Sequence, residues 1–243
     1  MGVCETGERE TGACEMDVCE AVASRYSCRA FLPVPVPEAT VRAIVERAAR
    51  APSGGNLQAW RIYAIAGERV DALKKLLEPR MGELPKGEGG EYQIFPTGLK
   101  EPYRSRRFGV GELLYRSINV PREDRPARYR QYARNFQFFG APVGLFFAID
   151  RTMLPAQWAD IGGLIQTVMV LARGYGLHTC PQEAWITWQR TLREFLKLPD
   201  ELMLFCGMAL GHEDPAAPIN SWRSPREPLE FYASFEGFSP NLP

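Results

Sequence analysis

The chain has only two histidines, and no pair of its six cysteines has the C-x-x-C spacing. Zinc sites need closely spaced thiols or paired histidines, so these shortages argue against a metal hydrolase and a zinc module. The sequence also lacks a P-loop, a G-x-S-x-G elbow and a G-x-G-x-x-G fingerprint. We therefore expect no metal site, and any dinucleotide that the protein uses would enter a shared pocket.

Net charge and long apolar runs are absent as well. The 243 residues carry 29 basic and 29 acidic side chains, which gives no basic excess for nucleic acid. No stretch approaches the ~18 consecutive apolar residues of a membrane span. Residues 1–16 are acidic and rich in Gly and Thr, without the apolar core of a secretory signal. We expect them to be disordered, residues 17–243 to form a single domain, and the protein to be cytoplasmic.

Two short arginine-containing segments lie near opposite ends of the chain. Their polar members are Arg25, Ser27 and Arg29 in the first segment and Arg223 and Arg226 in the second. Guanidinium groups present planar forks of donors that suit phosphate oxygens. A solvated surface turn is the alternative for either segment alone. Two such segments in a chain of zero net charge favour a pocket for one small anion.

A glycine-containing loop follows a predicted amphipathic helix at residues 38–50. Its candidate binding residues are Pro52, Ser53, Gly54 and Asn56. Proline ends the helix, and paired glycines allow a close approach of the backbone. The loop either lines a flat cofactor with polar edges or is an ordinary connection to the predicted strand at residues 60–65.

The strongest helical pattern spans Trp158 to Tyr175, where apolar residues form a surface too wide for a simple amphipathic helix. Such a helix is buried in the core or in a subunit interface. It leads into a turn whose candidate residues are Pro181, Glu183 and Ala184. Predicted strands at residues 143–149 and 203–210 are nearly continuous apolar runs. The mixed order predicts an α+β fold with a mostly antiparallel sheet covered by helices.

Tyrosines and arginines are interleaved between Glu78 and Phe139. Single-stranded nucleic acid and a solvated helical insertion are alternatives, but the interspersed acidic residues favour a helical lid over an aromatic, partly anionic substrate. The best candidates are Tyr103, Arg104 and Arg107, because Pro102 restricts the chain just before them. Beyond the second arginine segment, residues 229–243 form an aromatic extension that could embrace a partner subunit.

The order and contexts of these motifs resemble the nitroreductase family of FMN-dependent oxidoreductases. The resemblance covers Arg25 to about Tyr232 and is weak between Glu78 and Phe139. Members carry Pro-Ser-x-x-Asn-x-Gln-Pro-Trp beside the flavin, often from the partner subunit, and Pro-x-Glu-Gly-Phe near flavin N5 and O4. This chain departs from those patterns at Ala59 and Ala184.

The resemblance implies a homodimer with FMN at the interface, held by the arginine segments, the Pro52–Asn56 loop and the Pro181–Ala184 turn. NADH or NADPH would reduce the flavin, and a nitroaromatic would then take two electrons in a ping-pong cycle. The lid would set the choice of acceptor and leave flavin reduction unchanged. Alternatives are a reductive dehalogenase or quinone reductase of the same fold, or a non-catalytic flavin- or tetrapyrrole-binding protein. No catalytic side chain is named, because water or the flavin can supply the proton.

Overall fold

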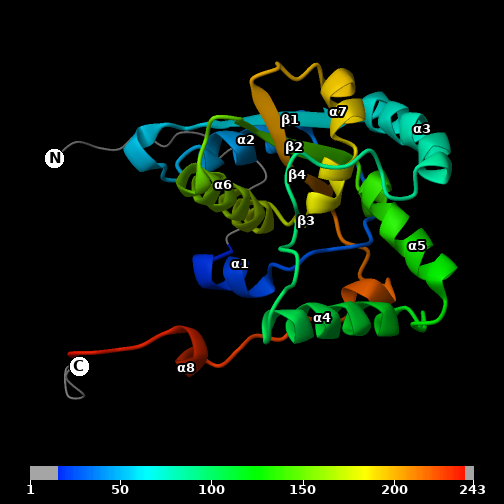
Figure 1. Ribbon diagram of the computed structural model, residues 1–243. Helices are drawn as coiled ribbons and strands as arrows, with labels where there is room; N and C mark the ends of the chain where they lie inside the picture. The colour runs from blue at the N-terminus through cyan, green and yellow to red at the C-terminus, as the bar shows by residue number, and fades with distance from the viewer. Residues whose placement is uncertain (1–15, 239–243) are drawn as a thin grey trace.

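The centre of the molecule is a four-stranded sheet (Figure 1), seen in a computed structural model that describes residues 16–238. The strands are β1 (Trp60–Ala66), β2 (Val143–Asp150), β3 (His178–Gln182) and β4 (Leu202–Gly211). Their order is β1-β2-β4-β3, and every neighbouring pair is antiparallel. This confirms the predicted α+β class. The N-terminal segment that we predict to be disordered comprises residues 1–16. Residues 1–15 of it lie outside the described residues.

Helices cover both faces of the sheet. The α-helices are α1 (Val18–Ser24), α2 (Glu38–Ala48), α3 (Glu68–Glu83), α4 (Tyr103–Ser117), α5 (Arg125–Ala133), α6 (Pro155–Gly174), α7 (Gln189–Leu196) and α8 (Leu229–Tyr232). Short 3₁₀ segments are η1 (Gly54–Asn56), η2 (Arg134–Gly140), η3 (Glu183–Thr187) and η4 (Pro218–Asn220). One apolar cluster joins α2 and α6 to the sheet, and a second joins α3, η2, η3 and α7 to its other face. The central strands β2 and β4 are buried along almost their whole length because both faces are covered.

Two predicted helix boundaries were wrong by a few residues. The helix expected to reach residue 50 ends at Ala48, where a turn leads to Pro52. The long helix begins at Pro155 rather than Trp158, because proline is well suited to the first helical turn. The Gln157 side chain also accepts a hydrogen bond from the Leu154 backbone N–H, at 3.3 Å, and so closes the start of the helix.

Helix α6 buries its large apolar side chains on one side, and its other side carries mostly small residues. Its large apolar side chains pack on the sheet of the same chain: Ile161, Leu164, Ile165, Val168 and Met169. The opposite side exposes small and polar residues: Ala156, Ala159, Gly162, Gly163 and Gln166. The sheet therefore accounts for the burial of the apolar side without a second subunit.

The Tyr/Arg-rich segment begins within α3, is helical in its middle and ends in the core. Glu78 lies inside α3, and Phe138 and Phe139 are fully or almost fully buried. In Figure 1, α4 lies at the bottom of the molecule and α5 at its right side. Within residues 16–238, no helix combines the length and apolar character that a membrane crossing requires.

Candidate functional site

The two arginine segments come together at one cavity of about 560 Å³. We call it the arginine cavity. Its polar wall includes Arg25, Tyr26, Ser27, Arg29, Gln166, Arg223, Ser224 and Arg226. Roughly two hundred residues of sequence separate the two segments, so the fold brings them together.

Backbone contacts hold both segments in place. Ser27 forms a parallel bridge with Thr179 of β3, and the Cys28 N–H donates to the Thr179 carbonyl at 2.9 Å. Asn220 then links the segments: its Oδ1 accepts from the Arg29 N–H, and its Nδ2 donates to the Ala30 carbonyl, both at 2.9 Å. Sequence reasoning missed Asn220, since a lone asparagine carries no local signal of a contact so far along the chain.

Several donors of the arginine cavity lack a strong acceptor. Among residues 16–238 no carboxylate pairs with Arg25, Arg29 or Arg226. In the part of the chain that the structure describes, Arg226 donates only within its own segment, for example to Ser224 Oγ at 2.6 Å. Burial, and secondarily the charge of Arg226, lowers the pKa of Arg25. The Trp222 Nε1 atom is buried without a partner in the described structure. Like-charged neighbours and spare donors are what a small anion would satisfy.

Arg223 has a different role from its neighbours. Its guanidinium lies 3.7 Å from the Tyr26 ring centroid and donates to the Asn220 carbonyl at 2.8 Å. These contacts use its planar face and part of its donor edge. Arg223 therefore supports the wall, whereas Arg25 and Arg226 keep free donor edges.

A half-buried polar network extends behind the arginine cavity from Tyr26 in its wall. The Tyr26 hydroxyl donates to Glu213, whose carboxylate also lies 3.4 Å from His178 Nε2. Arg173 donates to His178 Nδ1 at 3.1 Å, so that nitrogen acts as the acceptor of a neutral ring. Burial and the Arg173 charge lower the pKa of His178 to about 4. The imidazole is thus neutral at pH 7 and adds no charge to the wall.

The Pro181–Ala184 turn lies farther along the same strand. Pro181 is two residues beyond Thr179, a distance of ~7 Å in an extended strand. Glu183 and Ala184 begin η3, and partial desolvation raises the pKa of Glu183. Ala184 is absent from the positive-φ residues of the described chain. Alanine therefore fits this turn without strain, although glycine is usual in the resembling family.

The Pro52–Asn56 loop does not line the arginine cavity of its own chain. It forms η1 on the surface, where the Gly54 N–H donates to Asp160 Oδ2 at 3.1 Å. Asp160 and Gln166 are six residues apart on α6, or ~9 Å along the helix axis. The family resemblance implied that the loop lies beside the flavin, and in the single chain α6 contacts the loop through Asp160 and lines the arginine cavity through Gln166.

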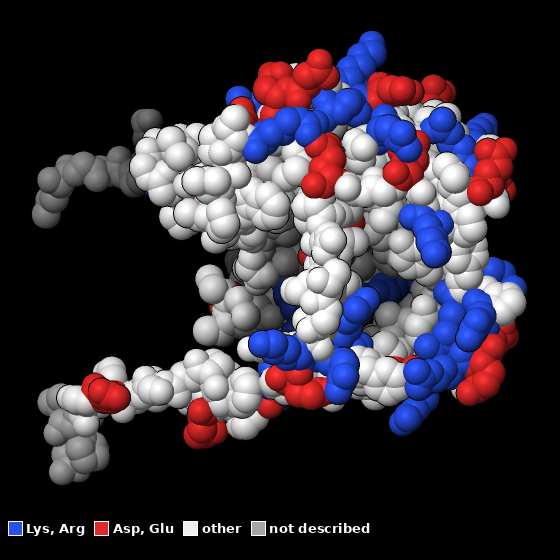
Figure 2. All heavy atoms as spheres, in the orientation of Figure 1, with Lys and Arg blue, Asp and Glu red and all other residues white. Residues whose placement is uncertain are grey.

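A larger cavity of about 1110 Å³ adjoins the arginine cavity, between α4 and residues 224–227. We call it the outer cavity. The two cavities share Val110, Ser224 and Arg226 as wall residues. Figure 2 shows basic side chains gathered around the hollow above α4.

Only one of the three predicted substrate residues lines the outer cavity. Arg107 does, with its guanidinium 3.8 Å from the Phe95 ring centroid. Tyr103 is 57% exposed and lies outside the wall. Arg104 also lies outside it and pairs with Glu101 at 2.7 Å. Tyr103 and Arg104 precede Arg107 by four and three residues, so they lie about one turn nearer the start of α4.

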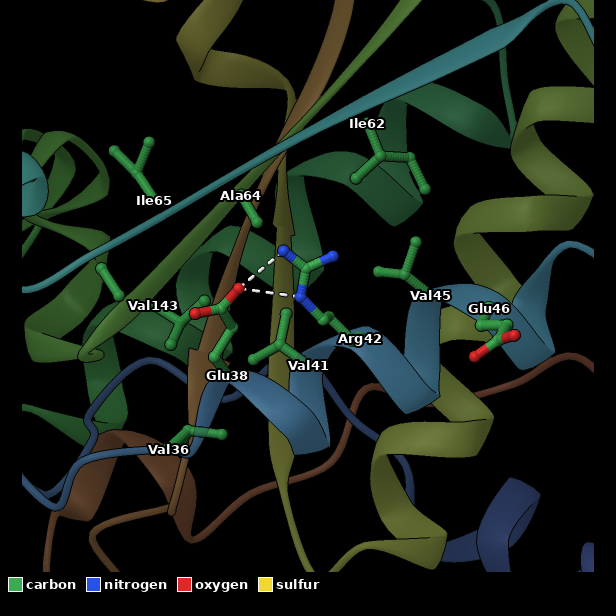
Figure 3. A pocket seen from close by; sticks show the side chains of 11 residues that line it. Val36, Glu38, Val41, Arg42, Val45, Glu46, Ile62, Ala64, Ile65 and Val143 are labelled. Atoms are coloured by element: carbon green, nitrogen blue, oxygen red, sulfur yellow. Dashed lines mark hydrogen bonds and ion pairs between the residues drawn. The ribbon is translucent and has the colours of Figure 1, made fainter.

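A third cavity, of about 820 Å³, lies between α2 and the edge strand β1 (Figure 3). Its lining is largely apolar, including Val41, Val45 and Ile62. The dashed lines in Figure 3 mark the contact of Arg42 with Glu38, at 2.7 Å. Arg42, the one arginine among the described lining residues, is thus already paired, so this groove is poorly suited to a phosphate.

Comparison with known proteins shows which family the chain belongs to. The model of the nitroreductase family matches residues 22–212, which include the first arginine segment, the sheet and the Pro181–Ala184 turn. The chain belongs to the nitroreductase family. The second arginine segment follows the matched region, so its contribution to the cavity rests on the structure.

Individual relatives agree over nearly the whole chain. A 4-nitrobenzoate reductase of Pseudomonas putida is 40% identical over 217 residues, covering 89% of this chain and 94% of the relative. A nitrobenzene nitroreductase of Ectopseudomonas oleovorans is 36% identical, covering 89% of this chain and 95% of the relative. The crystal structure of an FMN- and NADPH-dependent nitroreductase, NfnB, from Sphigopyxis sp. strain HMH is 45% identical. It has a TM-score of 0.88 and covers 92% of this chain and 100% of that chain.

Proposed function

We propose that this protein is an FMN-dependent NAD(P)H oxidoreductase that reduces nitroaromatic compounds. The observation that carries the proposal is the arginine cavity, where two distant segments present unpaired guanidinium groups beside a family-typical turn. Relatives named for the reduction of 4-nitrobenzoate and nitrobenzene support the substrate class. The NfnB structure, described as FMN- and NADPH-dependent, supports the cofactor and the reductant.

Within this proposal, the arginine cavity holds the phosphate of FMN. Arg25, Ser27, Arg29 and Arg226 are the donors, and Arg223 supports them from behind. Pro181, Glu183 and Ala184 orient the flavin ring, and Pro52, Ser53, Gly54 and Asn56 approach it from a second subunit. Bound FMN would accept two electrons from reduced nicotinamide and deliver them to an aromatic nitro group. The protein's part is orientation and electrostatics, so no side chain is assigned as a proton donor.

A homodimer follows from the same reasoning. Within one chain the Pro52–Asn56 loop is separated from the arginine cavity, and the exposed side of α6 is formed by small residues that permit close helix packing. Residues 229–238, which we call the C-terminal arm, expose aromatic side chains such as Phe231 and Phe235, and these supply apolar area for a partner subunit. These features support a second copy of the chain as the partner, with FMN between the two. We place this dimer in the cytoplasm.

The cofactor is tested first. The purified protein should show the visible absorption of oxidised flavin. Arg29→Ala should weaken FMN binding by about tenfold or more, because a charge-assisted hydrogen bond contributes roughly 1.5–3 kcal/mol. Arg69→Ala is the matched control, since Arg69 is an exposed arginine of α3 that stacks on Phe195 and lines neither the arginine cavity nor the neighbouring larger cavity. Equal FMN affinity in both variants would remove the arginine cavity from the flavin site.

Turnover is tested next. NADPH or NADH should bleach the flavin, and a nitroaromatic such as 4-nitrobenzoate should restore its colour. Restoration by quinones or halogenated aromatics alone would support the other reductases of this fold. A flavin that no nicotinamide cofactor bleaches would mark a non-catalytic flavoprotein.

A further inference from the structure

The outer cavity has a positively charged wall that the ion pairs of the chain leave uncompensated. Both acidic residues of the wall are paired: Glu227 with Arg106 at 2.7 Å, and Glu112 with Arg128 at 2.9 Å. Arg107 and Arg116 also line the cavity, and within residues 16–238 neither forms an ion pair. A cavity of about 1110 Å³ with two such cations at its wall is suited to a large anion.

The guanidinium group of Arg107 is fixed in place and has free hydrogen-bond donors. Its guanidinium lies 3.8 Å from the Phe95 ring centroid, which fixes its plane through a cation–π contact. Its N–H edge donates to no acceptor in the described chain and is free for an anion. A planar fork already fixed in this way loses less side-chain freedom when it binds phosphate oxygens.

Gly109 is a second feature of the same wall. It lies within α4, where glycine costs a helix about 1 kcal/mol relative to alanine. A side-chain carbon at this position would meet no atom within 4 Å, so packing inside the chain does not require glycine. Its absence of a side chain leaves the helix backbone open to whatever occupies the cavity.

The place of the outer cavity determines which part of a ligand it can hold. It shares Ser224 and Arg226 with the arginine cavity, and no residue of the Pro181–Ala184 turn lines it. A nitroaromatic acceptor must lie against the reactive ring near that turn. The occupant of the outer cavity is therefore the non-reacting end of a longer ligand, and NAD(P)H is the long co-substrate of the proposed reaction.

We propose that the outer cavity binds the phosphorylated adenosine end of NADPH, with Arg107 on the 2′-phosphate, so that the protein prefers NADPH to NADH. This rests on the proposed function, because it names the reductant of that site. A pyrophosphate is typically received by backbone N–H groups at a helix N-terminus. The wall here is the side of α4 and offers guanidinium groups, which suit a terminal phosphate. Arg107 is thereby assigned to the reductant and not, as the sequence suggested, to the acceptor.

The test compares Arg107→Ala with Arg104→Ala in the FMN-loaded protein. Arg104 is the matched control, because it lies on the same helix but pairs with Glu101 outside the cavity. In stopped-flow flavin reduction, Arg107→Ala should weaken the apparent affinity for NADPH about tenfold or more and change that for NADH less than about twofold. Arg104→Ala should change neither.

A binding measurement provides a readout that needs no turnover. Adenosine 2′,5′-bisphosphate should bind the wild type more tightly than adenosine 5′-monophosphate, and Arg107→Ala should remove the difference. Equal losses for NADPH and NADH would assign Arg107 to the pyrophosphate and overturn the proposal. An altered KM for 4-nitrobenzoate alone, or loss of FMN, would overturn it in favour of an acceptor or flavin contact. A wild type that holds no flavin would instead contradict the proposed function, and the two adenosine ligands would still report on the cavity.

Discussion

At the scale of single residues, the network behind the arginine cavity contains one group whose neutrality matters. His178 accepts from Arg173 at Nδ1 and faces Glu213 with Nε2. Protonating Nδ1 would place a second donor against the Arg173 guanidinium. Burial opposes the charged ring as well, and together these causes lower the pKa of His178 to about 4.

This pKa predicts a pH dependence of stability. Between pH 6.5 and about 4, His178 binds a proton in the unfolded chain but not in the folded chain. The free energy of unfolding therefore falls as the pH falls. The full effect is roughly 3 kcal/mol, and it is absent above pH 6.5, where both states are neutral. Urea unfolding of the wild type and His178→Asn from pH 7.5 to 4.5 measures it. Parallel pH profiles for the two proteins would contradict the assignment.

At the scale of elements, β4 and η3 fit together through a glycine. Gly207 of β4 lies directly against the fully buried indole of Trp185 in η3, and a side-chain carbon at Gly207 would overlap that ring. Trp185 Nε1 also donates to Gln182 Oε1 at 3.2 Å. The start of η3, which carries Glu183 and Ala184, is therefore positioned by close packing on the sheet.

Gly207→Ala should accordingly destabilise the protein by about 1–3 kcal/mol, the usual cost of overpacking a dense core. Chemical denaturation measures the change, and the displaced η3 should also weaken flavin binding. Gly82→Ala is the control, since that exposed glycine of α3 has open space around it and should cause no loss. A Gly207→Ala variant as stable as the wild type would show that the space between Gly207 and Trp185 can hold a methyl group, which contradicts close packing of β4 on Trp185.

At the scale of the whole molecule, the C-terminal arm extends away from the body (Figure 1). Phe231 is 54% exposed and Phe238 is 78% exposed. The edge strand β1 and the apolar groove beside α2 (Figure 3) are also open in the single chain. Exposed aromatic side chains and an open apolar groove on one chain are typical of surfaces that associate.

The dimer proposal predicts a mass in solution of twice the 27.4 kDa of the chain. Ending the chain after Pro228 removes the exposed aromatics of the arm and should shift the equilibrium toward monomer, because the apolar area of the interface shrinks. Light scattering over a dilution series measures the mass, and visible absorption of the same samples reports the bound flavin. A monomeric wild type with full flavin content and turnover would overturn the proposed dimer.

The sequence alone determined the features that depend on local pattern. Apolar runs of strand length predicted β2 and β4 within one residue at each end, because central strands are buried on both faces. The end of the long helix, predicted at Tyr175, lies within one residue of the observed end of α6, and the motifs identified the family before any contact was known. The arginine segments were also recognised as a pair, since two such segments stand out in a chain of zero net charge.

The tertiary structure alone decided which residues meet. Asn220 joins segments that lie far apart in the sequence, and Arg107, unlike Arg104, faces a cavity, although both follow Pro102 within a few residues. The exposed side of α6 appeared only once its apolar side had been placed on the sheet. Local periodicity predicts that one face of a helix or strand is buried, but it does not identify the elements that cover that face. The partner is chosen by packing across the whole chain, where each contact depends on all the others fitting at once.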